Sequence, residues 1–354
     1  MVVPTRRTAL WVVPVADLAG VARHVLDVVR VGLPGWSLVV LCPPGPLADR
    51  LVAQGAAVVA DPGFGVDAGP TSSVRVLRST IRALRPEVTH SHLAFADVVL
   101  AAAPGDTLRV STEHGIAGDR LLYQSGAARA RLKAAMHAAR IRRFDRLLAV
   151  SHATADAMRA AWHVTAPITV IPNGVDPVGR PQPAPDADGG VHVVSISRLA
   201  PEKRIPQLLE AFALVRQREP LARLTLAGTG PLERELRATV DRLGLQDAVT
   251  MPGFVDAADL LGRADVLVQL SAWENCSYSL LDAVARGVGV VASPVGGNPE
   301  LLPPRCLADP ADHDAVAAAI LAQAEPGPTR PSLPATVPTV AAMAARIAEV
   351  YESL

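Results

Sequence analysis

The chain has 354 residues, with 34 basic and 34 acidic side chains and therefore no formal net charge. Half of the residues are hydrophobic and only 19% are charged, which excludes an intrinsically disordered protein. A zero net charge argues against a general nucleic-acid binder, because such proteins are usually basic overall. The length exceeds that of most single hydrophobic cores, so we expect two domains.

Cysteine usage and the N-terminal residues bear on the compartment. The three cysteines, Cys42, Cys276 and Cys306, are widely spaced and match no disulfide framework or zinc motif. The apolar run at residues 8–16 is shorter than a signal peptide normally requires, so we interpret it as a first β-strand. No run approaches the ~18 apolar residues of a transmembrane helix. We expect a cytoplasmic protein, with peripheral contact at the inner face of the membrane as the alternative.

Short apolar runs alternate with helix-period segments through the first half of the chain. Nearly continuous apolar strands between helices are typical of a parallel sheet that is covered on both faces. The expected strands lie at residues 10–15, 38–42, 57–59, 88–90, 108–112, 147–150 and 168–171. The expected helices include residues 20–31, 71–85 and 124–143.

A linker and a second set of strands follow. Residues 177–190 contain four prolines and three glycines, which indicates a linker. Strands are then expected at residues 191–197, 224–228, 249–251, 266–270 and 288–292, and a last amphipathic helix at 339–353. We therefore predict an α/β fold of two doubly wound parallel-sheet domains facing across a cleft, where ligands bind beyond the carboxyl ends of the strands. The predicted domains are 1–176 and 191–336, joined by the linker and followed by the terminal segment 337–354.

The segment 270–300 carries the strongest chemical signal. Glu274 follows the end of a predicted strand, and the backbone amides of residues 276–279 open the next helix, where an anion is favoured. Asp282 lies about two turns along that helix. A carboxylate beside such amides can bind sugar hydroxyls while the amides hold a phosphate. The competing interpretation is helix capping and solvation.

Two further features of the second half favour a nucleotide. Arg198 and Lys203 leave the end of a predicted strand and could hold a diphosphate from two sides, although a solvated loop also explains such a pair. Gly228 and Gly230 form a tight turn that would let a nucleotide approach the backbone. Pro231 breaks the dinucleotide-binding pattern at this turn. No glycine fingerprint follows the first predicted strand either, which excludes a typical dehydrogenase.

Candidate residues in the first half are fewer. Gly20 begins a predicted helix, where backbone amides could meet a phosphate or the acceptor. His114 follows a predicted strand, and a capping or partly buried histidine is the competing interpretation. His90 and His92 should point the same way because they alternate along a strand. With no third ligand evident in the sequence, we predict no metal site.

The segment 127–146 contains seven cations and one acid. On a helix it would carry a basic stripe with an apolar side opposite. The stripe is Arg129, Lys133, His137 and Arg140, and the apolar side is Leu132, Met136 and Ala139. We interpret the stripe as a solvated face. The alternative is a dock, through Arg129–Arg146, for an anionic membrane or a phosphate-bearing acceptor.

Taken together, these motifs resemble the retaining glycosyltransferases of the GT-B fold, specifically glycosyltransferase family 4. The matching segments extend over nearly the whole chain, and the segment from Glu274 to Glu300 is the most specific. The others are Gly20–His24, Thr112–Gly115, Ala149–His152, Val170–Asp176, Ser197–Leu199 with Lys203, and Gly228–Pro231.

The resemblance implies a nucleotide-diphosphate-sugar donor on the C-terminal domain, the acceptor on the N-terminal domain, and a final helix that returns to the N-terminal domain. It implies no cofactor. By motif match, the diphosphate would be held by Arg198 and Lys203, the transferred sugar by Glu274, and the ribose by Asp282. His114 would lie near the donor sugar. Backbone amides would help to hold sugar and phosphate, namely those of Asn275, Cys276, Ser277 and Tyr278.

Two departures from the family pattern stand out. Asp282 occupies the position of a usual glutamate and is one methylene shorter. Residues 275–278, Asn-Cys-Ser-Tyr, replace a usual glycine-aromatic-glycine run, which changes the expected backbone geometry at the phosphate.

The expected function is metal-independent, retaining glycosyl transfer by same-face displacement, because no covalent nucleophile is evident. Family frequency favours a UDP-sugar such as UDP-GlcNAc or UDP-glucose, then GDP-mannose. The acceptor would be a glycan, a lipid-linked molecule or a small molecule. The alternatives are a nucleotide-sugar epimerase or hydrolase of the same fold, and a non-catalytic nucleotide-sugar-binding partner subunit.

Overall fold

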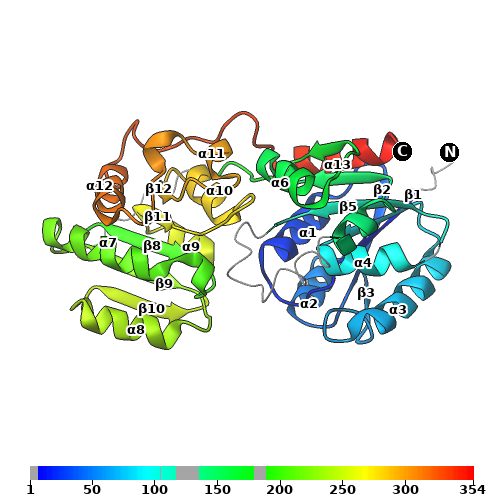
Figure 1. Ribbon diagram of the computed structural model, residues 1–354, viewed down its shortest axis with the longest axis horizontal. Coiled ribbons are helices and arrows are strands. Elements are labelled where there is room, and N and C mark those ends of the chain that lie inside the picture. The colour runs from blue at the N-terminus through cyan, green and yellow to red at the C-terminus, as the bar shows by residue number, and fades with distance from the viewer. Residues whose placement is uncertain (1–6, 104, 117–134, 179–188) are drawn as a thin grey trace. The chain divides into compact units, whose positions relative to one another are not determined.

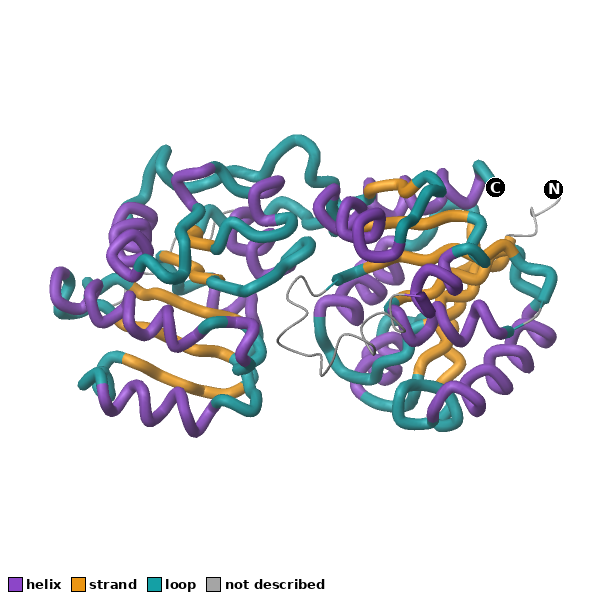
Figure 2. Tube along the Cα trace, viewed as in Figure 1, coloured by secondary structure: helices purple, strands orange, loops and turns teal. Residues whose placement is uncertain are grey.

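The computed structural model describes residues 7–103, 105–116, 135–178 and 189–354 (Figure 1). These residues form two compact units. The first unit contains the N-terminal residues up to 116, residues 135–174 and the C-terminal residues 338–354. The second contains 175–178 and 189–337. Each unit holds one parallel sheet with helices on both faces (Figure 2).

The first unit is built on a seven-stranded parallel sheet of order β3-β2-β1-β4-β5-β6-β7. Its strands are β1 (Arg7–Val12), β2 (Trp36–Cys42), β3 (Ala57–Ala60), β4 (Val88–His92), β5 (Leu108–Glu113), β6 (Arg146–Ala149) and β7 (Ile168–Val170). Its helices include α1 (Gly20–Val31), α2 (Pro46–Ala53), α3 (Gly69–Leu84), α4 (Ala94–Ala102), α6 (His152–Trp162) and α13 (Val340–Glu352). Residues 135–141 are also helical.

Strand β1 shows why its sequence is apolar throughout. Ala9 and Trp11 belong to the core cluster on one face of the sheet, whereas Leu10 and Val12 belong to the cluster on the other face. Successive side chains of a strand point to opposite faces, and helices cover both faces here, so no position can be polar without cost. This confirms the prediction of a covered parallel sheet.

The final helix α13 packs on the first unit, as expected (Figure 1). Its apolar side, including Met343 and Ile347, is buried in the same core cluster as Trp11. The chain passes close to the start of α13 at Gly174. A Cβ added there would lie 2.8 Å from the carbonyl oxygen of Thr339, so only glycine allows this approach.

The second unit is built on a five-stranded parallel sheet of order β10-β9-β8-β11-β12. Its strands are β8 (His192–Ile196), β9 (Arg223–Ala227), β10 (Val249–Gly253), β11 (Val266–Gln269) and β12 (Gly289–Ala292). Its α-helices are α7 (Ile205–Arg218), α8 (Glu233–Arg242), α9 (Ala257–Leu261), α10 (Tyr278–Ala285), α11 (Asn298–Leu301) and α12 (His313–Ala324), with short 3₁₀ turns η1 (Pro201–Lys203) and η2 (Pro304–Cys306).

The predicted elements agree with the observed ones wherever the structure describes them. Residues 124–134 of the predicted helix at 124–143 and residues 179–188 of the predicted linker lie outside the described residues. Each predicted strand overlaps an observed strand, with β1 beginning three residues before the predicted start at residue 10. The predicted helix at residues 20–31 coincides with α1. Among the described residues, no helix combines the length and hydrophobicity needed to cross a membrane.

Candidate active site

In the second unit, Lys203 and Glu274 form an ion pair. Lys203 lies at the end of η1, just after β8, and Glu274 lies in the loop after β11. The Ser271 hydroxyl donates to Glu274 Oε1 at 2.8 Å and lies 3.4 Å from Lys203 Nζ. The side chains of Lys203 and Glu274 are only 19% and 11% exposed. Two residues that the sequence analysis assigned to neighbouring parts of one donor are therefore in direct contact.

Arg198 lies on the same loop as Lys203 and pairs with Glu202. Its side chain is 62% exposed, whereas that of Glu202 is 3% exposed. The carbonyl of Glu202 also accepts a hydrogen bond from the amide of Ala272 at 2.7 Å. This backbone contact joins the loop after β8 to the loop after β11, so the positions of Arg198, Lys203 and Glu274 are coupled.

Glycines let neighbouring segments pack closely against the loops that carry Arg198 and Glu274. A Cβ at Gly228 would lie 2.0 Å from the carbonyl oxygen of Ser197, and one at Gly230 would lie 2.3 Å from that of Leu199. A Cβ at Gly296 would lie 1.7 Å from the carbonyl oxygen of Glu274. The predicted role of Gly228 and Gly230 was approach of a nucleotide. The backbone that approaches them in the structure is the loop that carries Arg198.

The helix after Glu274 begins as the sequence indicated. Helix α10 starts at Tyr278, so Asp282 lies about one turn into it, and the predicted distance of two turns is wrong. Asp282 is 4% exposed, and its Oδ1 lies 3.6 Å from Arg286 Nη1. Asn275 and Tyr278 are buried, Cys276 and Ser277 are partly buried, and the Ser277 hydroxyl accepts a hydrogen bond from Gln269 at 3.0 Å. Ser277 makes no side-chain cap to the helix, so α10 opens with backbone amides that its own N-cap does not satisfy.

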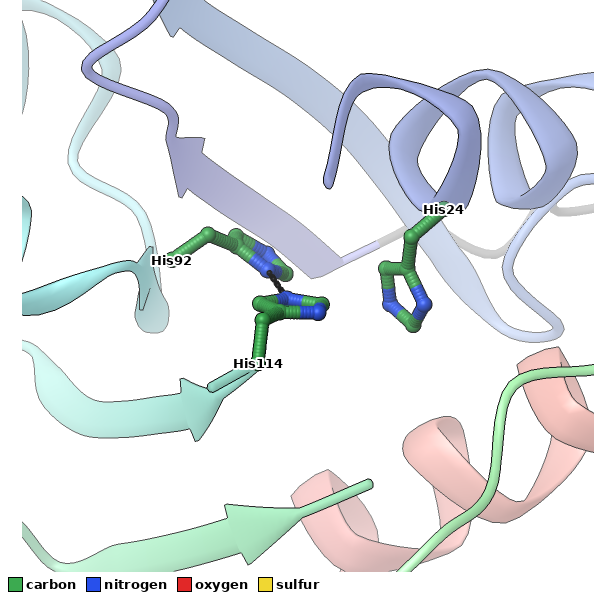
Figure 3. Close-up of side chains that lie close together, drawn as sticks. All are labelled: His24, His92 and His114. Carbon is green, nitrogen blue, oxygen red and sulfur yellow. Dashed lines mark hydrogen bonds between the residues drawn. The ribbon is translucent and has the colours of Figure 1, made fainter. Parts of the chain in front are cut away.

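In the first unit, three histidines lie together (Figure 3). His92 ends β4, His114 follows β5, and His24 extends from α1 towards them. His92 Nδ1 lies 2.9 Å from His114 Nε2, and the ring centroids of His24 and His114 are 4.9 Å apart. The sequence analysis found no further ligand beside His90 and His92. The structure supplies two around His92, from separate elements.

His90 does not join this group. Its ring stacks on that of His92 with centroids 4.5 Å apart, as expected for alternate residues of a strand. However, His90 Nε2 bonds to the Thr112 hydroxyl at 2.7 Å, and its Nδ1 contacts the hydroxyl of Tyr351. The Tyr351 hydroxyl also accepts a hydrogen bond from Trp11 Nε1 at 2.9 Å. Both ring nitrogens of His90 are thus engaged in a structural network with α13.

Burial keeps the clustered imidazoles neutral. It lowers the pKa of His24 to about 4, with the hydrogen bond to Asn173 acting in the opposite direction. Burial also lowers the pKa of His92 and of His114 well below the usual value, and neighbouring histidines add to the effect. At neutral pH these rings therefore carry lone pairs rather than positive charge.

A buried ion network supports the turn that holds His114. Arg140 lies 3.1 Å from both Asp97 and Glu113, and all three side chains are at most 3% exposed. Glu113 Oε1 accepts a hydrogen bond from the amide of Gly115 at 3.2 Å. This bond connects the residues on either side of His114. Burial raises the pKa of Glu113 to about 7, with Arg140 acting in the opposite direction.

This network corrects the interpretation of the basic segment. Arg129 and Lys133 lie outside the described residues. His137 and Arg140, the described half of the predicted basic stripe, are 7% and 4% exposed, whereas Met136 on the predicted apolar side is 46% exposed. The prediction that the stripe is a solvated face is therefore wrong for these two residues. Arg140 is drawn inwards because two buried carboxylates require a counter-charge.

The remaining candidate, Gly20, begins α1 and is exposed, one turn before His24. The sequence analysis missed the roles of His24, Asn173, Asp97 and Arg140. His24 ends the segment Gly20–His24, which matches the family. Its place on the buried side of the amphipathic helix α1 was the signal that could have identified it.

Comparisons with known proteins agree with the resemblance. The family described as Glycosyltransferase Family 4 matches residues 18–178, and the one described as Glycosyl transferases group 1 matches residues 190–325. Between them these matches span both units.

Individual relatives and solved structures share about a fifth to a third of their residues with this chain. Glycogen synthase of Mycobacterium tuberculosis is 29% identical over 323 residues, which cover 81% of this chain and 77% of the relative. The phosphatidylinositol N-acetylglucosaminyltransferase gpi3 subunit of Schizosaccharomyces pombe is 31% identical over 140 residues, covering 38% of this chain and 31% of the relative. The crystal structure of Anabaena Alr3699/HepE in complex with UDP-glucose has a TM-score of 0.77 at 21% identity and covers 97% of this chain and 95% of the other.

Proposed function

The chain belongs to the group 1, family 4 glycosyltransferases and has their GT-B fold, and from this premise we propose that it transfers a hexose from a UDP-sugar with retention of anomeric configuration. The observation that carries the proposal is the contact of Lys203 with Glu274 and Ser271, beside Arg198. It combines a cation for phosphate with a carboxylate and a hydroxyl for sugar hydroxyl groups.

The chemistry follows from where charge develops. Breaking the bond between the anomeric carbon and the diphosphate places negative charge on the leaving group and positive charge on the sugar. Arg198 and Lys203 would stabilise the leaving diphosphate, with the amides at the start of α10 contributing. This arrangement needs no metal ion for the leaving group. Because Arg198 is largely exposed, a donor can reach it without displacing buried groups.

The Lys203–Glu274 pair gives Glu274 a defined orientation before the donor arrives. The carboxylate accepts from Ser271 and pairs with Lys203 through Oε1. Its Oε2 would then accept hydrogen bonds from hydroxyls of the transferred sugar. Asp282 would contact the ribose, although its interaction with Arg286 must then be shared.

His114 would contribute as a neutral hydrogen-bonding group near the donor sugar. Its Nε2 is engaged by His92, so Nδ1 is the nitrogen that would meet a substrate. A neutral ring suits a group that approaches a sugar developing positive charge, since an imidazolium there would oppose the transition state. Same-face displacement is the corresponding retaining route.

A UDP-sugar is favoured over GDP-mannose because the similar Anabaena structure holds UDP-glucose. The decisive experiment screens UDP-glucose, UDP-GlcNAc and GDP-mannose by thermal shift, because a donor that binds the folded state raises Tm. The best donor is then supplied in radiolabelled form with candidate glycan, lipid-linked and small-molecule acceptors, and the anomeric configuration of the product is determined by NMR. Inversion at the anomeric carbon would overturn the retaining mechanism.

Variants assign the site within that assay. Arg198→Ala and Lys203→Ala should each reduce turnover by about 10²-fold or more, because each removes preorganised charge from the leaving group. Arg234→Ala is the matched control, since Arg234 is an exposed arginine on α8 of the same unit. Near-normal turnover in both site variants would refute the assignment.

The alternatives are separated by the same preparations. An epimerase or hydrolase would consume the donor at the same rate with and without acceptor. A non-catalytic partner subunit would give a thermal shift with the donor but no turnover with any acceptor. Acceptor-dependent release of UDP contradicts both.

The acceptor and membrane contact remain separate parts of the proposal. Contact through Arg129–Arg146 would have to use exposed residues such as Arg142 and Arg143, because Arg140 is buried. Co-sedimentation with anionic vesicles at low and high salt tests it, since electrostatic binding weakens with salt. Absence of salt-sensitive binding would remove the membrane from the proposal.

A further inference from the structure

The imidazoles of His24, His92 and His114 converge on one point (Figure 3). One ring nitrogen from each lies within 4.8 Å of the other two. His24 and His92 are 2% and 0% exposed, while His114 is partly exposed, so the group is buried but open on the side of His114. Among the described residues, this is the group of histidine, cysteine and carboxylate side chains whose geometry fits a metal ion.

Hydrogen bonding leaves ring nitrogens in this group without partners. His24 Nδ1 lies 3.2 Å from Asn173 Oδ1, and because an amide oxygen only accepts, Nδ1 must carry the proton. His24 Nε2 then bears a lone pair, and this buried atom has no partner among the described residues. His92 Nε2 is also buried without one. An unpaired buried lone pair is costly, and the one on His24 Nε2 calls for a group that satisfies it.

The donor set has the character of a transition-metal site. Imidazole nitrogen is a common ligand of Zn²⁺, and the three rings each offer one nitrogen to the same point. A metal-bound histidine usually donates its other ring proton to an oxygen acceptor, as His24 does to Asn173. Three histidines with an open fourth position form a known zinc arrangement.

The geometry requires only a small adjustment. Zn–N bonds of about 2.0–2.1 Å in a tetrahedron place the nitrogens about 3.3 Å apart. His92 Nδ1 and His114 Nε2 are already 2.9 Å apart, joined by one hydrogen bond. When a metal ion replaces that hydrogen bond, the proton moves to the other nitrogen of the ring that carries it. Both imidazoles therefore stay neutral. Rotation of the His24 ring would close the remaining distance.

We propose that His24, His92 and His114 form a binding site for one divalent transition-metal ion, with zinc preferred, and with a fourth position open to water or a substrate oxygen. The site lies wholly within the first unit, and its metal-binding tests do not use the glycosyl-transfer assay. It shares His114 with the proposed donor-sugar contact, so a bound ion and the sugar would compete for this residue. It would not serve the leaving diphosphate, for which Arg198 and Lys203 provide the charge.

The first test needs no variant. Full-length protein without a histidine tag is treated with a chelator, loaded with one equivalent of Zn²⁺ and freed of excess metal. X-ray absorption at the zinc edge should then show about three imidazole ligands and one further oxygen ligand at tetrahedral distances. Failure to retain zinc, or a shell with fewer than three imidazoles, would overturn the proposal.

Titration with Co²⁺ then identifies the ligands. The visible absorption of tetrahedral cobalt should saturate at one equivalent in the wild-type protein. His24→Gln and His92→Gln should each abolish this absorption or weaken Co²⁺ binding by about tenfold or more. Asn173→Ala should weaken Co²⁺ binding by about 10- to 100-fold, because it removes the hydrogen bond that orients His24. His163→Asn is the matched control, because His163 is an exposed histidine of the same unit whose left-handed backbone asparagine tolerates. Unchanged Co²⁺ binding in His24→Gln and His92→Gln, each checked for folding by its metal-free melting curve, would contradict the assignment.

Discussion

Lys203 Nζ and Glu274 Oε1 pair across 71 residues of sequence and join the loops after β8 and β11. The pair is mostly buried, so its charges are less screened than those of a surface ion pair. The protein therefore holds the cation and the carboxylate of the proposed donor site in a defined arrangement.

A double-mutant cycle should detect this coupling. Lys203→Ala and Glu274→Gln, made singly and together, should show an interaction free energy of about 1–3 kcal/mol in urea denaturation, because the two side chains are in contact. The exposed pair Arg237–Glu233 on α8 serves as the comparison and should show a smaller coupling. Additive effects at Lys203 and Glu274 would show that the ion pair does not organise the loops.

Gly296 should be required both for stability and for donor binding. Alanine there meets the carbonyl oxygen of Glu274 and also adopts a left-handed backbone, with φ of 52°. Gly244→Ala is the matched control, because Gly244 has φ of 66° but no neighbour within 4 Å of its added Cβ. The control should cost about 1–2 kcal/mol of unfolding free energy, whereas Gly296→Ala should cost more and raise the KM for the donor. Equal effects on stability and KM would show that the contact with Glu274 is unimportant.

Arg140 should be essential to the fold rather than to a surface. Arg140→Met leaves Asp97 and Glu113 buried without their cation and should cost about 3–5 kcal/mol in urea denaturation. Arg142→Met is the control, because Arg142 is exposed, and its unfolding midpoint should barely change.

The cost of Arg140→Met should also depend on pH. Burial raises the pKa of Glu113 to about 7 even with Arg140 present, so protonation of the carboxyl at low pH removes much of the need for a cation. The loss of stability should therefore be smaller at pH 5 than at pH 8. A loss that is the same at both values would mean that the ion pair is not the source of the effect.

His24 should make stability depend on pH. Its pKa is about 4 in the folded protein against 6.5 as the reference value, so the unfolded chain takes up the proton first as pH falls. Its contribution is therefore fully present above pH 6.5 and is lost between pH 6.5 and 4, by about 3 kcal/mol in all. Urea midpoints of metal-free protein at pH 7 and pH 4.5 measure it, and His24→Gln should lessen the decrease. His163→Asn should leave the wild-type pH dependence in place.

Tyr351 should anchor α13 through its hydroxyl. Tyr351→Phe removes the acceptor of Trp11 Nε1 and the partner of His90 Nδ1, both of which are buried. Leaving such groups unpaired should cost about 1–3 kcal/mol of unfolding free energy. Glu352→Gln, at the next position of α13, alters a more exposed contact with Trp36 and should have a smaller effect on the melting temperature. A larger loss of stability in Glu352→Gln than in Tyr351→Phe would place the anchoring contact at Glu352.

The sequence by itself determined the two sheets, their strands and the amphipathic final helix, whereas the return of that helix to the first unit came from the family resemblance. Strands buried on both faces must be apolar throughout, and helices must carry one apolar side, so these patterns are local and readable. It also indicated Arg198, Lys203 and Glu274, because each lies beside the end of a strand and the ends of parallel strands gather at one edge.

Only the tertiary structure decided which side chains meet. His24, His92 and His114 come from a helix and two strand ends, and their convergence depends on how α1 packs over the sheet. Arg140 carried the same local signal as an exposed arginine. Its burial is dictated by Asp97 and Glu113, which are distant in the chain, because the free energy of a buried charge depends on its partners and not on its own sequence neighbours.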